Sequence, residues 1–145
     1  MISLKVIYDR LKSKTSYTIE YAKDKEPNIQ ELTALPIVTV GYAGLDSKSP
    51  NLPIEHDIYN LHGENLVQSF DIISICDSTK PDTLAAMVRN IHGALVGYTP
   101  TVSIASLQGV SGLTYSQGGV IGLVNSKIIW LDRYKIGFPT IDVLF

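Results

Sequence analysis

The first chemistry to consider is metal binding, because imidazole and carboxylate side chains of the kind that bind zinc gather in one stretch of the chain. These are His56, Asp57, His62 and Glu64. A metal site also needs an element that presents its ligands rigidly, whereas residues 44–65 contain prolines, glycines and polar residues without clear periodicity. We therefore favour a solvated loop. A small metal- or ligand-binding enzyme using His56, His62 and Glu64 is the alternative from a different functional class.

The second chemistry is nucleophilic catalysis by a thiol. Cys76 is the only cysteine, and His92 is the histidine that would serve as its base. Cys76 ends an apolar run, where a buried and inert thiol is the usual case, and His92 lies at the border of a helix's buried stripe. A single cysteine excludes an internal disulfide and fits a reducing compartment.

Phosphate binding and paired carboxylates complete the search for chemistry. Residues 111–119 have the glycine content of a phosphate-binding loop, but strand-like residues follow them and the segment has no lysine. We interpret the segment as a hairpin loop. No pattern brings Asp24 and Glu26, or Asp132 and Asp142, together in a cleft. The sequence therefore predicts no catalytic residue, no metal and no cofactor, and a protein that is not an enzyme.

Two helices are predicted from apolar residues that recur with helical spacing. Residues 2–13 carry one such stripe. The second helix opens with Thr79 as its expected N-cap, Pro81 in its first turn and Asp82 at a capping-box-like spacing. Gly97 suits the exit from this helix. The buried stripe of the second helix comprises Leu84, Met87, Val88, Ile91 and Leu95.

The remaining segments predict strands and connections. The run at 66–76 carries apolar residues on both faces, which is expected of a strand in the middle of a sheet. Asn125 and Ser126 are typical of a hairpin turn, and residues 44–65 predict a long mobile loop. The predicted strands span 17–21, 35–42, 66–76, 102–104, 120–124 and 127–136, with a Gly/Ser-rich segment at 109–119 and a tail at 137–145.

This order of elements predicts an α+β fold with a mostly antiparallel sheet of about four to six strands and two helices packed on one face. The chain has 145 residues, the size of one ordinary domain, so we expect a single domain over residues 1–145.

Composition narrows the classes of partner. The formal net charge is −2, and the only local basic bias, at Arg10, Lys12 and Lys14, complements a helix dipole. Sequence-specific nucleic-acid binding is therefore not expected. The beginning of the chain does not resemble a signal peptide, and no apolar run reaches the roughly 18 residues that span a bilayer, so we expect a cytoplasmic origin and no membrane partner. Charged residues make up only 18 %, below the roughly 25 % usual for soluble domains, which favours a surface partly covered by partners.

Several features favour self-association. The outward face of the second helix contains small residues, and Gly93 there costs about 1 kcal/mol relative to alanine. The apolar run Val143-Leu144-Phe145 needs cover, and open strand edges can pair across subunits. We expect a homo-oligomer with closed symmetry. The candidate inter-subunit face comprises Asp82, Ala86, Arg89, Asn90 and Gly93.

The order of several local segments along the chain is also informative. An N-terminal helix precedes Leu35-Pro36-Ile37-Val38-Thr39-Val40, and a long polar loop leads to Gln68-Ser69-Phe70-Asp71-Ile72. The helix at 84–95 runs into Val96-Gly97-Tyr98-Thr99-Pro100, and a Gly-rich turn precedes a strand centred on Trp130. This layout, nearly end to end, resembles the tail-terminator (tail-completion) proteins of long-tailed bacteriophages and related contractile particles, including the Mu-like prophage group.

The resemblance implies a virion protein, assembled in the host cytoplasm, that forms a ring, usually a hexamer, on the head-proximal end of the tail tube. The ring would stop tube polymerisation and face the head–tail connector. Implied partners are the tail-tube protein, the connector or neck protein and the sheath, with DNA passing through the ring; no cofactor is implied. Another head–tail joining protein is the nearest alternative. Implied tube or lumen contacts are Lys48, Glu55, His56, Asp57 and Gln117.

Overall fold

The computed structural model describes residues 2–22, 35–48, 61–100 and 112–143, with residues 47–48, 61–65 and 138–143 described by their backbone alone. One five-stranded sheet has the strand order β1-β2-β3-β5-β4. β1 runs parallel to β2, and every other neighbouring pair is antiparallel. The elements are α1 (Leu4–Lys14), β1 (Thr18–Tyr21), β2 (Ile37–Lys48), β3 (Leu61–Asp77), α2 (Pro81–Leu95), β4 (Thr114–Val124) and β5 (Lys127–Val143).

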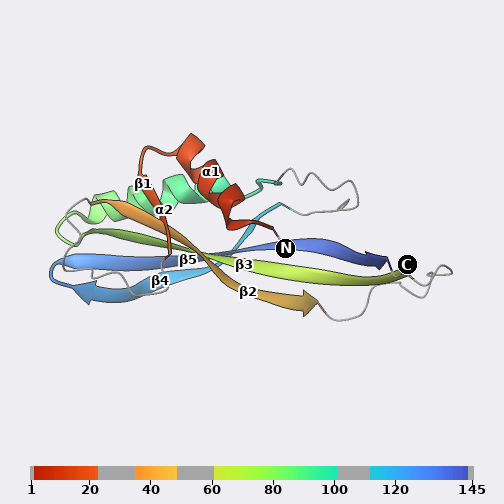
Figure 1. The fold of residues 1–145 in the computed structure, drawn as a ribbon. Helices are drawn as coiled ribbons and strands as arrows, with labels where there is room; N and C mark the ends of the chain where they lie inside the picture. The colour runs from red at the N-terminus through yellow and green to blue at the C-terminus, as the bar shows by residue number, and fades with distance from the viewer. Residues whose placement is uncertain (1, 23–34, 49–60, 101–111, 144–145) are drawn as a thin grey trace.

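Both helices lie on one face of the sheet, and β3 and β5 continue well past them (Figure 1). This arrangement confirms the predicted α+β fold, with a mostly antiparallel sheet and two helices on one face. None of the helices in the described part of the chain is long and apolar enough to cross a membrane.

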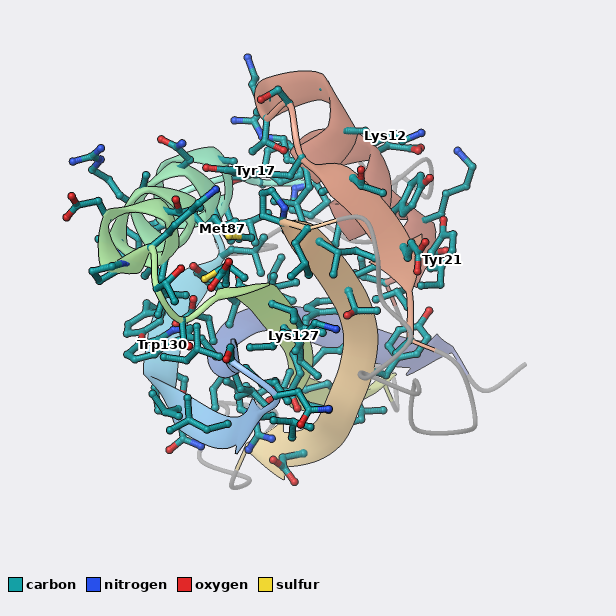
Figure 2. All side chains as sticks on the ribbon, turned by 90° about the vertical axis from the view of Figure 1, so that its left-hand side faces the viewer. Lys12, Tyr17, Tyr21, Met87, Lys127 and Trp130 are labelled. Carbon is teal, nitrogen blue, oxygen red and sulfur yellow. The ribbon has the colours of Figure 1, made fainter. Side chains whose placement is uncertain are left out.

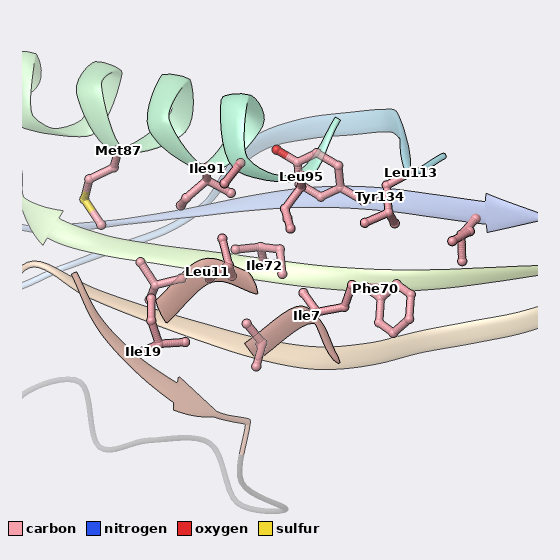
Figure 3. Close-up of a cluster of buried hydrophobic side chains, with 14 of the residues drawn as sticks. Ile7, Leu11, Ile19, Phe70, Ile72, Met87, Ile91, Leu95, Leu113 and Tyr134 are labelled. Atoms are coloured by element: carbon pink, nitrogen blue, oxygen red, sulfur yellow. The ribbon is translucent and has the colours of Figure 1, made fainter. Parts of the chain in front are cut away.

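The main core fills the space between the helices and the sheet. Ile7 and Leu11 of α1 and Ile91 of α2 are fully buried against Phe70 and Ile72 of β3 (Figure 3). A smaller apolar cluster of Ile37, Ile75 and Ile129 lies on the opposite face. Because β3 contributes to both clusters, its predicted place in the middle of the sheet is confirmed.

The start of α2 differs from the prediction. The N-cap is Lys80, and its side chain forms no capping hydrogen bond. Thr79 instead donates from its backbone N–H and its hydroxyl to Asp77 Oδ1, at 2.9 and 2.8 Å. The hydroxyl therefore stabilises the turn that leaves β3 rather than capping the helix. Pro81 begins α2, where its missing N–H leaves no helical hydrogen bond unmade.

The strands extend beyond their predicted ends. Residues 44–48 and 61–65, predicted as loop, are parts of β2 and β3. Residues 44–48 pair with 65–69 of β3, and residues 61–65 pair with 139–143 of β5, while 49–60 lie outside the described residues. The predicted tail is strand as far as Val143. These strand ends are polar and contain glycine, so their own sequence does not predict a strand. They are strand because they pair with other strands of the sheet. The hairpin turn is confirmed, with positive φ at Asn125 and Ser126. The predicted strand at 102–104 lies outside the described residues.

Candidate assembly interface

Among the strands that the structure describes, β4 forms one edge of the sheet and pairs only with β5. Residues 114–119 belong to this strand, so the predicted hairpin loop at 111–119 is wrong over that range. The strand Thr114–Val124 contains no charged residue and no proline. Soluble proteins usually protect an open edge with such residues, because unpaired backbone N–H and C=O groups invite pairing with another chain. An uncharged edge of this length is therefore a candidate interface.

The side chains of β4 add an exposed apolar surface to the open backbone. Val120, Ile121 and Leu123 are 50, 57 and 68 % exposed. The pairing register shifts between Tyr115 and Gln117 and again around Ile121, and such bulges re-aim side chains along an edge strand. This part of the strand therefore presents both apolar groups and hydrogen-bonding groups to a partner.

A second open edge lies on the other side of the sheet. Within the described residues, β1 pairs with the first four residues of β2, Ile37 to Val40, and with no other strand. The later part of β2 pairs with β3 alone among the strands of the sheet. Tyr42 and Leu45 in this part are about half-exposed. In the view along the strands, Trp130, close to β4, and Tyr21, on β1, lie toward opposite edges of the sheet (Figure 2).

A buried carboxylate holds β4 in place from beneath. Asp132 of β5 is fully buried, and its Oδ1 accepts hydrogen bonds from Tyr115 Oη at 3.0 Å and Trp130 Nε1 at 2.8 Å. Burial raises the pKa of Asp132, and these two donors oppose that rise. Because Tyr115 belongs to β4, the carboxylate ties the edge strand to its neighbour β5.

Aromatic rings extend this anchor to α2. The His92 ring meets the edge of Tyr115 at a centroid distance of 5.2 Å, and Tyr115 packs edge-on against Tyr134 at 5.5 Å. Oδ2 of Asp132 and the hydroxyl of Tyr134 have no hydrogen-bond partner among the described residues. Burial raises the pKa of Tyr134, with the Asp132 charge adding to the rise. The cluster thus keeps a costly buried charge beside the edge strand.

The Asp132→Asn variant is expected to gain stability relative to wild type as the pH rises from 3 to 7. The folded state raises the carboxyl pKa above its unfolded value of about 3.9. The wild-type contribution is therefore fully present below that value and is lost as pH rises through the folded pKa. The uncharged amide keeps an oxygen that can accept from Tyr115 and Trp130. Urea unfolding of both proteins across this range measures the difference, and parallel pH profiles would contradict the expectation.

The predicted inter-subunit face on α2 is placed on the outer surface. Asp82, Arg89, Asn90 and Gly93 are exposed and Ala86 is partly buried. Three of them line a shallow groove of about 400 Å³ between α2 and the end of α1. Asn90 Nδ2 donates to Tyr17 Oη at 2.9 Å, which links α2 to the chain after α1. The groove is lined by Lys14, Thr15, Ser16, Arg89, Asn90, Gly93 and Ala94.

Two of the five residues implied as tube or lumen contacts, Lys48 and Gln117, lie in the described part of the chain. Glu55, His56 and Asp57 lie outside the described residues. Gln117 is exposed on β4, and Lys48 ends β2, which is not a neighbour of β4 in the sheet. The described residues contain no group of three or more side chains suited to a metal ion.

The two residues considered for thiol catalysis lie in different environments. Cys76 is buried as predicted, and burial raises the pKa of its thiol. His92 is exposed rather than part of the core, and its ring contacts Tyr115. Sequence reasoning missed the buried role of Asp132. The available signal was a carboxylate on the strand face that also carries Ile128, Trp130, Tyr134 and Ile136.

Comparison with known proteins adds one structural likeness. No protein-family profile and no curated protein sequence matches this chain. The fold is similar to that of a chain in the virion of a native gene transfer agent particle, with a TM-score of 0.66. The two chains share one fold. The match covers 92 % of each chain at 17 % sequence identity, so it includes the whole arrangement of sheet and helices rather than a single motif.

Proposed function

We propose that this chain is a non-enzymatic structural protein of a phage-like virion. The observation that carries the proposal is the shared fold with a chain of the gene transfer agent virion over 92 % of both chains. The open, uncharged edge strand and its exposed apolar side chains support it, because such edges are normally covered in an assembly. Within the virion, we propose that the protein lies in the neck, where the tail joins the head.

The finer proposal is that the protein is a tail terminator. Copies of the chain form a ring, with six subunits as in the family that the sequence resembles, and the ring seats on the head-proximal end of the tail tube. The mechanism is geometric: the ring occupies the last tube surface and leaves no site for another tube subunit. Its opposite side meets the head–tail connector, the sheath lies alongside, and DNA passes through the opening without sequence-specific contacts.

The test combines mass in solution by light scattering with negative-stain images of the same peak, followed by addition of tail-tube subunits. Rings with a central hole that bind tube ends and stop their growth would support the terminator. Binding to the connector but not to the tube would indicate another neck protein. A monomer that tube subunits fail to recruit would overturn the terminator role and favour a monomeric adaptor.

The groove between the helices supplies a separate prediction about the ring. Lys14 and Arg89 line the groove, and neither forms an ion pair within the described part of the chain. If α2 faces a neighbouring subunit, Arg89→Glu is expected to weaken ring formation at least about tenfold, through unfavourable charge at the contact. The matched control is Lys80→Glu, which makes the same change of charge at the exposed N-cap of the same helix. Ring formation and tail joining that survive Arg89→Glu would remove Arg89 from the interface.

A further inference from the structure

We infer that successive copies of this chain join head to tail through the two open edges of the sheet. In this arrangement β4 of one copy adds to the free part of β2 of the next. This free part is Gly41 to Lys48, which pairs with β3 alone among the described strands. The inference rests on the proposed ring and names the contact that would build it. It commits to a second copy of this chain as the partner of both edges.

Strand direction is the first argument. β2 runs opposite to β3, β3 opposite to β5, and β5 opposite to β4. β2 and β4 of one chain therefore point in opposite directions. When a second copy continues the sheet in the same orientation, its β2 lies antiparallel to β4 of the first. The new pair extends the existing alternation and forms the hydrogen-bond pattern of an ordinary antiparallel sheet.

Chemical match between the edges is the second argument. β4 presents exposed Val120, Ile121 and Leu123, and the free part of β2 presents half-exposed Tyr42 and Leu45. Pairing would remove apolar side chains on both edges from water. β4 contains no charged residue, so its burial leaves no uncompensated charge on that side of the contact.

Preorganisation of β4 is the third argument. The strand is already paired with β5 along its inner edge, and Tyr115 is fixed to the buried Asp132. A partner strand therefore does not have to order this backbone, and the entropy cost of association is lower. On the other edge, the Tyr42 hydroxyl accepts a hydrogen bond from the backbone N–H of Leu4 at 2.7 Å, which links that part of β2 to the start of α1.

Symmetry distinguishes this contact from the simplest alternative. Pairing of β4 with β4 about a twofold axis would close with two copies and leave Tyr42 and Leu45 in water. A contact between two different edges leaves each copy with one further edge of each kind, and it closes into a ring when the rotation between copies allows. The ring proposed above needs a contact of this second type.

Cross-linking between single-cysteine variants tests the inference. Ile121→Cys places a thiol on β4 and Leu45→Cys places one on β2. The native Cys76 is buried and is not expected to react with the reagent. The two variants carry tags of different mass, are mixed under ring-forming conditions, and are treated with a short bifunctional thiol reagent that tolerates a small error in register. If rings form only on the tube, tube subunits are present in the mixture.

The expected result is a cross-linked dimer that contains one copy of each variant, while each variant alone remains uncross-linked. Ala85→Cys, an exposed position on α2, replaces either partner as the control and is expected to give no product. Self-linking of Ile121→Cys alone would overturn the inference in favour of twofold β4 pairing. Rings that form without the mixed product would also overturn it and leave the proposed function intact, whereas failure of the proposed function appears as absence of rings and of tube binding.

A charge placed on the edge gives an independent readout. Ile121→Lys is expected to weaken self-association at least about tenfold, because a lysine on an edge strand opposes pairing with a second strand. Light scattering measures the mass, and circular dichroism and thermal unfolding verify that the variant is folded. Ser78→Lys, which adds the same charge at an exposed position in the turn after β3, is the matched control. A folded Ile121→Lys variant that assembles like wild type would overturn the assignment of β4 to the contact.

Discussion

Gly118→Ala is expected to lower the free energy of unfolding by about 2–4 kcal/mol, through overpacking together with the loss of a partly buried hydrogen bond to a buried carboxylate. A Cβ atom at Gly118 would overlap Tyr115 Oη and Asp132 Oδ1 and would lie 3.2 Å from the backbone oxygen of Leu131. Because Tyr115 donates to Asp132 at this point, the methyl group must push apart two side chains that hold each other, of which Asp132 is buried. β4 would then lose its anchor to β5.

The neighbouring glycine provides a matched control for this prediction. A Cβ atom at Gly119 would have no atom within 4 Å. Gly119→Ala is therefore expected to change stability by no more than about 1 kcal/mol, with any gain arising from a less flexible unfolded chain. Both variants change the same residue type in the same strand and differ only in what the methyl group meets.

Urea unfolding followed by tryptophan fluorescence measures this difference directly. Trp130 is the only tryptophan, and its Nε1–H donates to Asp132. Its emission therefore reports on the environment of the carboxylate as well as on global unfolding. Equal midpoints and unchanged emission for Gly118→Ala and Gly119→Ala would show that the cluster rearranges without cost, and would contradict the assigned role of Gly118.

Gln68→Leu is expected to destabilise the protein by about 2–4 kcal/mol, because two buried backbone groups lose their partners. The buried Gln68 side chain accepts from the backbone N–H of Ile2 and donates to the backbone oxygen of Ile2, each at 2.8 Å. This pair of bonds fastens the segment before α1 to β3. Hydrogen exchange at Ile2 and Leu4, together with urea unfolding, measures the local and the global effect.

Two further variants separate this anchor from helix capping. Ser3→Ala removes the α1 N-cap, whose side chain accepts from Lys5 N, and is expected to cost about 1 kcal/mol. Gln68→Glu keeps an acceptor but places a carboxyl group at a buried site, so its folded pKa should rise. That variant should be most stable at low pH and lose stability as pH rises through the raised pKa. If Gln68→Leu lowers the free energy of unfolding no more than Ser3→Ala does, Gln68 does not anchor the segment before α1.

The sequence by itself predicted the features that depend on nearby residues. The stripe at 2–13 predicted α1, and the stripe at 84–95 with Pro81 predicted α2. Asn125 and Ser126 predicted the hairpin, since only a few residue types accept positive φ at both turn positions. The two-sided apolar pattern at 66–76 placed β3 inside the sheet. Helical periodicity and turn chemistry are local, so these elements can be predicted without knowledge of their neighbours.

Only the tertiary structure decided how the strands pair and what β4 does. Residues 114–119 contain glycines and polar side chains that are typical of a loop, yet pairing with β5 makes them strand. Gly118 is small because it faces Asp132 and Tyr115, a reason that lies in another strand. The placement of β5 between β3 and β4, and of β1 parallel to β2, likewise depends on contacts between segments far apart in the chain. The exposed edge follows from that order alone, because a strand becomes an edge through the absence of a neighbour in the sheet and not through its own sequence.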